Sequence, residues 1–147
     1  MKGGKLYPLF VNTTTVIPVQ EWREAKIGEL VDETHVRSRL GALALRPGWH
    51  STEVPLADWI GKMQNGELVQ RKDTVWCECE VRGEELEVKE RNGLRTIPDG
   101  FYFFKTRPAQ PFPWIVSRWI MIIRILSHDE VAAICREHGV EAQKMES

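Results

Sequence analysis

The sequence lacks a long uninterrupted hydrophobic run, and this absence excludes a membrane-spanning helix. Its longest apolar stretch runs from Trp114 to Leu126, and Arg118 and Arg124 interrupt those thirteen residues, whereas a spanning helix needs about twenty. The first residues, MKGGKLYPLFVNTTT, also lack the apolar core of a signal peptide. We therefore expect a cytoplasmic protein with no membrane partner, in which the 114–126 segment forms one or two buried strands.

Cysteine is scarce, with only Cys77, Cys79 and Cys135 in 147 residues. A disulfide between Cys77 and Cys79 would be badly strained because a single residue separates them in an expected strand. Reduced thiols are the economical interpretation. Since the sequence contains no Cys-x2-Cys pair and no His-x3-His spacing, we expect no metal site.

Net charge is also small, at −1, which gives no overall attraction to nucleic acid. Acidic residues are nevertheless absent from Val36–Thr52 and from Gly100–His128, where basic residues, Arg107 among them, lie between aromatic ones. This pattern suits phosphate contacts combined with ring stacking. The structural alternative is that Arg118 and Arg124 pair with carboxylates on a neighbouring strand.

Internal repeats, low-complexity tracts and linkers are absent as well, so residues 1–147 are expected to form one domain, with an ordered core at about 5–139 and a frayed tail. We predict an α+β fold: a mostly antiparallel sheet, which could be split, with two or three short helices. Alternating or apolar patterns predict strands at 5–11, 74–81, 101–106 and 114–126.

Three segments are expected to be helical. Residues 21–31 suit a short helical turn, and Pro55–Met63 has apolar residues at helical spacing before a stop at Asn65–Gly66. The third helix is the best marked, because Ser127 and Glu130 form a capping box ahead of it and Gly139 follows it.

The densest set of chemically versatile side chains is the stretch RPGWHST, residues 46–52. Arg46 could bind an anion, Trp49 could stack on a ring, and His50 is a candidate general acid or base. Ser51 and Thr52 could contact the same ligand. The structural alternative is a type II turn at Pro47–Gly48, with the tryptophan packed on the core and a hydroxyl capping the next helix.

A second candidate cluster follows in VWCECEV. Glu78 and Glu80 could share proton transfer as paired carboxylates, and Glu78 could serve with His50 as a catalytic residue. Trp76 beside them could contact a ligand. Glu78 and Glu80 on one strand face could instead keep an exposed edge soluble. Cys77 and Cys79 are expected on the opposite face, toward the core.

Several separated phrases resemble an uncharacterised domain of phages and mobile elements, associated with gut bacteria and with large phage polyvalent proteins. The phrases are LYPLFVN, RPGWHSTEVPLADWIG, VWCECEV, IPDGFYFFKT and WIVSRWIMIIRILSHDEV, and they span about residues 5–135. The resemblance implies an accessory domain without an established activity, which binds a host or phage macromolecule.

More distantly, the order of elements is similar to that of ADP-ribosyltransferase-like domains. There GWHST and the following helix would cover a nicotinamide pocket, so the resemblance implies NAD as cofactor, with Trp49 near the nicotinamide and Ser51 or Thr52 on the ribose side. The chain departs from that family, since LYPLFV lacks the cofactor-gripping Arg or His and the closing strands lack the transferase glutamate. These departures favour nucleotide binding over transfer.

Three functions therefore stay open, and the sequence leaves open whether the protein is an enzyme. It could bind a macromolecule through exposed aromatics, bind a nucleotide as a divergent transferase-like protein, or bind nucleic acid through its basic and aromatic segments. A cavity lined by Arg46 and His50 would argue against the first of these alternatives.

Overall fold

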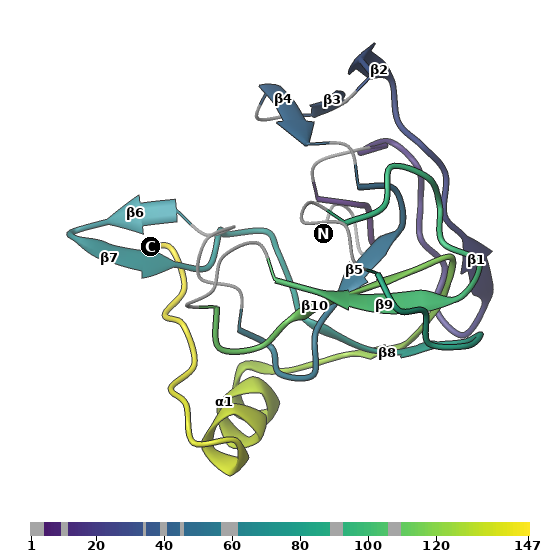
Figure 1. Ribbon diagram of the computed structural model, residues 1–147. Helices are drawn as coiled ribbons and strands as arrows, with labels where there is room; N and C mark the ends of the chain where they lie inside the picture. The colour runs from purple at the N-terminus through teal and green to yellow at the C-terminus, as the bar shows by residue number, and fades with distance from the viewer. Residues whose placement is uncertain are drawn as a thin grey trace.

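The computed structural model describes residues 5–9, 12–33, 35–38, 41–44, 46–56, 62–88, 93–105 and 110–147. These residues form eleven strands and one α-helix, and the strands pair in small antiparallel sheets (Figure 1). The expected α+β class with two or three helices is therefore wrong, and the described fold is mostly β.

Two consecutive strands, β10 (Trp114–Ser117) and β11 (Trp119–Ile125), organise the molecule. Each is the central strand of its own three-stranded sheet, in the orders β5-β10-β9 and β1-β11-β8. Their partners are β5 (Trp49–Ser51), β9 (Phe101–Phe104), β1 (Trp22–Glu24) and β8 (Cys77–Val81). The predicted strand or strand pair at 114–126 is thus a pair, and the chain changes sheets at Arg118.

The core follows the alternation that the sequence predicts for β8. Cys77, Cys79 and Val81 pack against the buried Ile120 and Ile122 of β11, whereas Glu78 and Glu80 are exposed. Period-2 alternation places every second side chain on one face, so this strand was predictable from local sequence. The prediction of strand β9 from FYFF is also confirmed.

Two smaller sheets lie at the periphery. Strands β2 (Leu30–Asp32), β3 (His35–Ser38) and β4 (Gly41–Ala44) form one, which stands apart from the central sheets in Figure 1. Strands β6 (Lys62–Gln64) and β7 (Glu67–Val69) form a hairpin on another side.

The first two predicted helices are not observed in the described residues. Strand β1 falls within 21–31, and β2 begins there at Leu30. Trp22 and Glu24 pair with β11, and this distant partner overrides the weak helical pattern. Residues 57–61 of the helix predicted at Pro55–Met63 lie outside the described residues, but Met63 belongs to β6.

The predicted helix stop at Asn65–Gly66 is in fact the turn of the β6–β7 hairpin. Asn65 and Gly66 have φ angles of 51° and 81°, the positive values that a type I′ turn requires and that Asn-Gly favours. The predicted first strand at 5–11 is reduced, in its described part, to an isolated bridge between Leu6 and Ile17.

The third predicted helix is confirmed as α1 (His128–Glu137). The Ser127 side chain accepts a hydrogen bond from the Glu130 amide, and the Glu130 side chain accepts one from the Ser127 amide. Val131 and Cys135 are its buried residues, and Gly139 follows with a φ of 72°. No helix in the described ranges is both long enough and apolar enough to cross a bilayer.

The tail that we expected to be frayed makes specific contacts. Gln70, next to β7, and Met145 form a parallel bridge, and the C-terminus lies beside the hairpin in Figure 1. The tail therefore packs on a part of the chain more than seventy residues earlier.

Candidate functional site

A cavity of about 1620 Å³ lies against both central sheets. The sequence-predicted site residues on its wall are Arg46, Trp49, His50, Ser51, Thr52, Trp76 and Glu78. Arg107 lies outside the described residues. The cavity is larger than the 300–1,000 Å³ of an ordinary small-molecule pocket. Two residues can therefore both line it without lying close enough to contact the same ligand.

Strand register separates His50 from its neighbours in the sequence. His50 pairs with Val116, which pairs in turn with Tyr102, and directly opposed residues of antiparallel strands point to the same face. Trp114 and Phe104 are also paired and lie on this face, two residues along. Trp49 and Ser51 point to the opposite face. The stretch RPGWHST therefore divides across a sheet.

Arg46 lies on the His50 face. Its guanidinium carbon is 4.6 Å from the centre of the Phe104 ring, a cation–π distance. Partial burial is the main influence on this group and lowers the Arg46 pKa from its usual value, because burial disfavours the charged form. The group still carries its positive charge at neutral pH, since an arginine titrates far above it.

His50 packs its ring edge-on to Trp114, with ring centres 5.8 Å apart. Its Nδ1 lies 3.2 Å from the carbonyl oxygen of Gly48. The ring reaches solvent through the cavity, yet surrounding protein atoms desolvate it and lower the pKa of His50 to about 4. The Arg46 charge lowers this pKa further, despite the opposing hydrogen bond to Gly48. The imidazole is therefore neutral at pH 7, with one nitrogen able to donate and the other to accept.

Two more cavity residues complete this cluster. Trp76 packs against the buried group of Tyr102, Trp114 and Val116. The Thr52 hydroxyl is buried and has no hydrogen-bond partner within the described chain, which marks it as a group that a ligand or water could satisfy. We call Arg46, His50, Thr52, Trp76 and Trp114, with Phe104 behind the guanidinium, the Arg46 site.

Trp49 and Ser51 have structural roles on the other face. The Trp49 Nε1 donates to the Arg23 carbonyl at 3.0 Å, and its ring packs on the Leu6, Ile120 and Ile122 cluster. Ser51 lies within β5, so it caps no helix, and its hydroxyl donates to the Ile115 carbonyl at 3.5 Å. The predicted packing of Trp49 on the core is confirmed.

The turn expected before Trp49 differs in geometry. Gly48 has a φ of 136°, well beyond the +80° of a type II turn. A Cβ atom at Gly48 would lie 2.6 Å from Val116 Cγ1 and 3.1 Å from the Ser117 carbonyl oxygen. Close packing against β10 therefore sets this backbone conformation.

Glu78 is held by the other sheet rather than by His50. Its carboxylate forms an ion pair with Arg124 at 3.3 Å, and Arg124 also pairs with Glu130. Within the described chain, Glu78 and His50 do not hydrogen-bond each other. The proposed catalytic pair is therefore not assembled.

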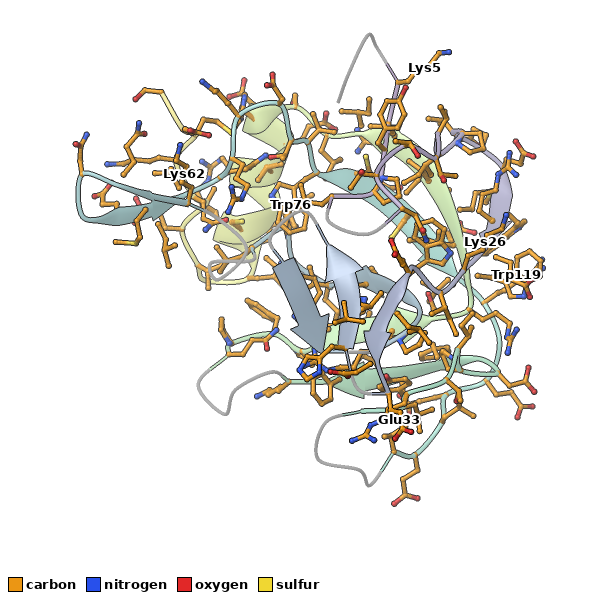
Figure 2. All side chains as sticks on the ribbon, turned by 90° about the horizontal axis from the view of Figure 1, so that it is seen from above. Lys5, Lys26, Glu33, Lys62, Trp76 and Trp119 are labelled. Atoms are coloured by element: carbon orange, nitrogen blue, oxygen red, sulfur yellow. The ribbon has the colours of Figure 1, made fainter. Side chains whose placement is uncertain are left out.

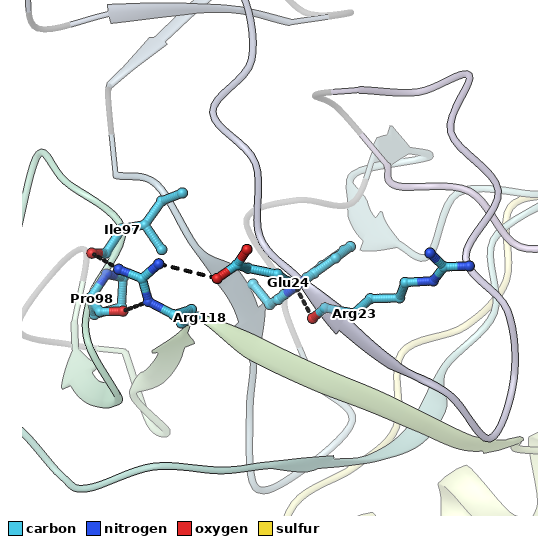
Figure 3. Close-up of polar contacts among 6 residues, drawn as sticks. Arg23, Glu24, Ile97, Pro98 and Arg118 are labelled. Atoms are coloured by element: carbon cyan, nitrogen blue, oxygen red, sulfur yellow. Dashed lines mark hydrogen bonds and ion pairs between the residues drawn. The ribbon is translucent and has the colours of Figure 1, made fainter.

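Two basic residues of the acid-free segment, Arg118 and Arg124, are engaged by other parts of the chain. Arg118 donates to the Pro98 and Ile97 carbonyls at 2.9 and 3.3 Å and pairs with Glu24 at 3.3 Å, as Figure 3 shows. Together with the Arg124 ion pairs, these contacts confirm the structural alternative for both arginines.

Trp114 and Phe104 were not among the predicted site residues. Both lie in the acid-free aromatic stretch, and that stretch was the available signal. Their place beside Arg46 and His50 depends on the register of β9, β10 and β5, which joins segments more than fifty residues apart. Local pattern carries no information about that register.

The residues assigned to NAD by resemblance are divided across the sheet. Trp49 and Ser51 lie on the face opposite to His50, whereas Thr52 belongs to the Arg46 site. Met63, the last residue of the expected covering helix, belongs to β6. Among the described residues, no group of three or more His, Cys, Asp or Glu side chains could hold a metal ion.

Comparison of the chain with protein-family models, with curated protein sequences and with solved structures found no match. The resemblances to the phage domain and to ADP-ribosyltransferase-like domains therefore stay predictions.

Proposed function

We propose that the protein is a ligand-binding domain whose Arg46 site takes a small molecule with a flat ring and an anionic group, as in a mononucleotide. The observation that carries this proposal is the meeting of Arg46, His50 and Trp114 on one cavity wall. Arg46 offers a cation for a phosphate and His50 a neutral imidazole for ring nitrogens or oxygens, while the half-buried Trp76, which packs on the Trp114 group, offers an indole for stacking.

The lowered pKa of the His50 imidazole also supports a small-ligand site at this place. A desolvated titratable group in a cavity is a recognised mark of a functional site. The buried, unpartnered Thr52 hydroxyl adds a further polar contact on the same wall. A cavity lined by Arg46 and His50 also favours a small ligand over a macromolecule docked on exposed aromatics, which was the first function predicted from the sequence.

Charge balance favours one anionic group over a nucleic acid strand. Among the described residues of the cavity wall, basic and acidic side chains offset one another: Arg23, Lys26, Arg46 and Lys72 against Glu24, Glu53, Asp73 and Glu78. A polynucleotide needs a run of cationic contacts along its backbone, and a neutral wall does not supply one. A mononucleotide needs only the charge of Arg46.

The proposal is tested by titrating the protein with adenosine, guanosine, cytidine and uridine monophosphates and with the corresponding nucleosides. Intrinsic tryptophan fluorescence reports binding because Trp76 and Trp114 belong to the site. We expect at least one monophosphate to bind below millimolar concentration and its nucleoside to bind at least tenfold more weakly, since a charge-assisted hydrogen bond contributes about 1.5–3 kcal/mol.

Arg46→Met and Arg95→Met provide a matched pair of variants. Arg95 is exposed and lies outside the cavity-lining set. We expect Arg46→Met to weaken monophosphate binding by about ten- to a hundredfold and Arg95→Met to leave it unchanged. Equal affinities of the two variants, or the absence of any binding at millimolar nucleotide, would reject the proposal.

A further inference from the structure

The last described residues pack next to the β6–β7 hairpin through main-chain hydrogen bonds to Gln70. The Gln70 amide donates to the Lys144 carbonyl at 2.8 Å, and the Glu146 amide donates to the Gln70 carbonyl at 2.8 Å. These two bonds form the parallel bridge between Gln70 and Met145. An extended segment that adds main-chain hydrogen bonds to a sheet edge is the geometry of β-augmentation.

A single glutamate is recognised at this edge. Glu146 Oε1 accepts from the Lys62 ammonium at 2.7 Å, and Oε2 accepts from the Lys72 backbone amide at 2.9 Å. Only 8% of the Glu146 side chain is exposed, whereas 52% of the Lys62 side chain is exposed. The carboxylate is thus enclosed by its two donors, which come from the open end of the hairpin, where Lys62 pairs with Val69 and the chain continues to Lys72.

Flanking contacts extend the recognition to both neighbours. The Ser147 amide donates to Gln64 Oε1 at 3.0 Å, and the Lys144 ammonium lies 3.5 Å from Glu67 Oε2. Figure 2 shows Lys62 on the hairpin, at the opposite end of the molecule from Trp119. The peptide contacts therefore lie on a separate element from the central sheets.

We propose that this edge of the hairpin, from Gln64 to Lys72, is a peptide-binding site selective for a short strand that carries glutamate at the position of Glu146. In the structure the chain's own Lys144–Ser147 segment occupies it. The partner in trans is a peptide strand of the same pattern, Lys-Met-Glu-Ser, which binds when the internal segment is weakened. This inference does not depend on the ligand of the Arg46 site.

Competition with the internal strand sets the design of the experiment. A tethered segment has an effective concentration in the millimolar range. In the wild-type chain the Lys144–Ser147 segment therefore occupies the site and competes with added peptide. Glu146→Gln in the full chain removes the carboxylate that binds the two donors and leaves the strand length unchanged. A labelled peptide of residues 141–147, EAQKMES, is then titrated by fluorescence anisotropy against the wild-type chain and this variant.

We expect the peptide to bind the Glu146→Gln chain with a dissociation constant below about 1 mM and the wild-type chain at least tenfold more weakly. The same peptide with glutamine at the Glu146 position should bind the variant at least tenfold more weakly than the wild-type peptide. Equal binding of the two peptides, or no binding to the variant at millimolar peptide, would overturn the proposal.

Circular dichroism first establishes that the Glu146→Gln chain is folded, and Glu146→Ala is the second variant if it is not. Amide hydrogen exchange gives an independent readout. Because the Lys72 amide donates to Glu146, Glu146→Gln should speed Lys72 exchange severalfold, and excess wild-type peptide should slow it again. Unchanged Lys72 exchange in the variant would likewise contradict the proposal.

Discussion

At the scale of single residues, His50 gives the clearest dependence on pH. Desolvation by the surrounding protein lowers its pKa to about 4 in the folded state, while the unfolded chain keeps a value near 6.5. Between these two values the unfolded state binds more protons. Folding stability should therefore rise with pH across this window and fall on acidification from about 6.5 toward 4.

Urea unfolding at a series of pH values measures this slope. His50→Gln keeps a polar side chain but cannot titrate, so its stability should change less with pH between 4 and 6.5 than that of the wild type. An NMR titration of the His50 ring should give a midpoint well below the usual value for histidine. Identical slopes for the two proteins would contradict the lowered pKa of His50.

Gly48 should tolerate no side chain. An added Cβ would lie 2.6 Å from Val116 Cγ1, and the φ of 136° is itself unfavourable for alanine. We expect Gly48→Ala to lower the free energy of unfolding by roughly 3 kcal/mol. The control is Gly66→Ala, where φ is also positive but no atom lies within 4 Å, and its cost should be about 1–2 kcal/mol. Chemical denaturation gives the free energy of unfolding of both variants. The loss in Gly66→Ala reports backbone strain alone, and the additional loss in Gly48→Ala reports the steric clash.

At the scale of secondary-structure elements, helix α1 depends on its capping box. Ser127→Ala removes the acceptor for the Glu130 amide and should cost about 1 kcal/mol of stability. Ser127→Asp restores an acceptor at the same place and should recover most of that loss. Thermal unfolding followed by circular dichroism makes the comparison, and equal melting temperatures for the alanine variant and the wild type would contradict it.

Elements whose formation rests on local chemistry were the ones that the sequence predicted correctly. The capping box and the glycine that follows α1 act within one or two turns, and the alternation of β8 is a property of consecutive residues. Strands β1 and β2 are three residues each, too short to show a period. β1 exists because Trp22 and Glu24 meet β11 about a hundred residues later.

The prediction of a helix stop at Asn65–Gly66, where the β6–β7 hairpin turns, was wrong for a different reason. Asn65–Gly66 carried a hairpin signal, but the apolar spacing from Leu56 to Met63 favoured a helix that would end there. In the structure Met63 pairs with Leu68 across the turn. At Met63 the turn-forming dipeptide thus outweighed the helical spacing.

At the scale of the whole molecule, burial should make the three cysteines unreactive together. Burial raises the pKa of Cys77 to about 11 and raises that of Cys79, and Cys135 is fully buried. Since the thiolate is the reactive form, we expect slow modification by a disulfide reagent at pH 8 in the native state. Three thiols should react rapidly in denaturant. Fast modification of any of them in the native state would contradict the packing.

The candidate site shows where prediction from sequence ends. Arg46, His50, Thr52 and Trp76 were all predicted as candidates, and they line one cavity. Trp49 and Ser51 were predicted with them but point across the sheet, and Glu78 is ion-paired with Arg124. Residue type identifies side chains capable of chemistry, whereas strand register decides which of them meet.

The sequence by itself determined the C-terminal helix, the alternating strand β8 and the absence of a membrane-spanning run, because each depends on residues close together along the chain. Only the tertiary structure decided that the fold is mostly β, that Trp114 and Phe104 join Arg46 and His50, and that the tail forms a bridge to Gln70 beside the hairpin. These outcomes depend on hydrogen bonds and packing between distant segments. Each such contact stabilises the fold only when both segments are in place. The sequence of either segment alone therefore does not predict the contact.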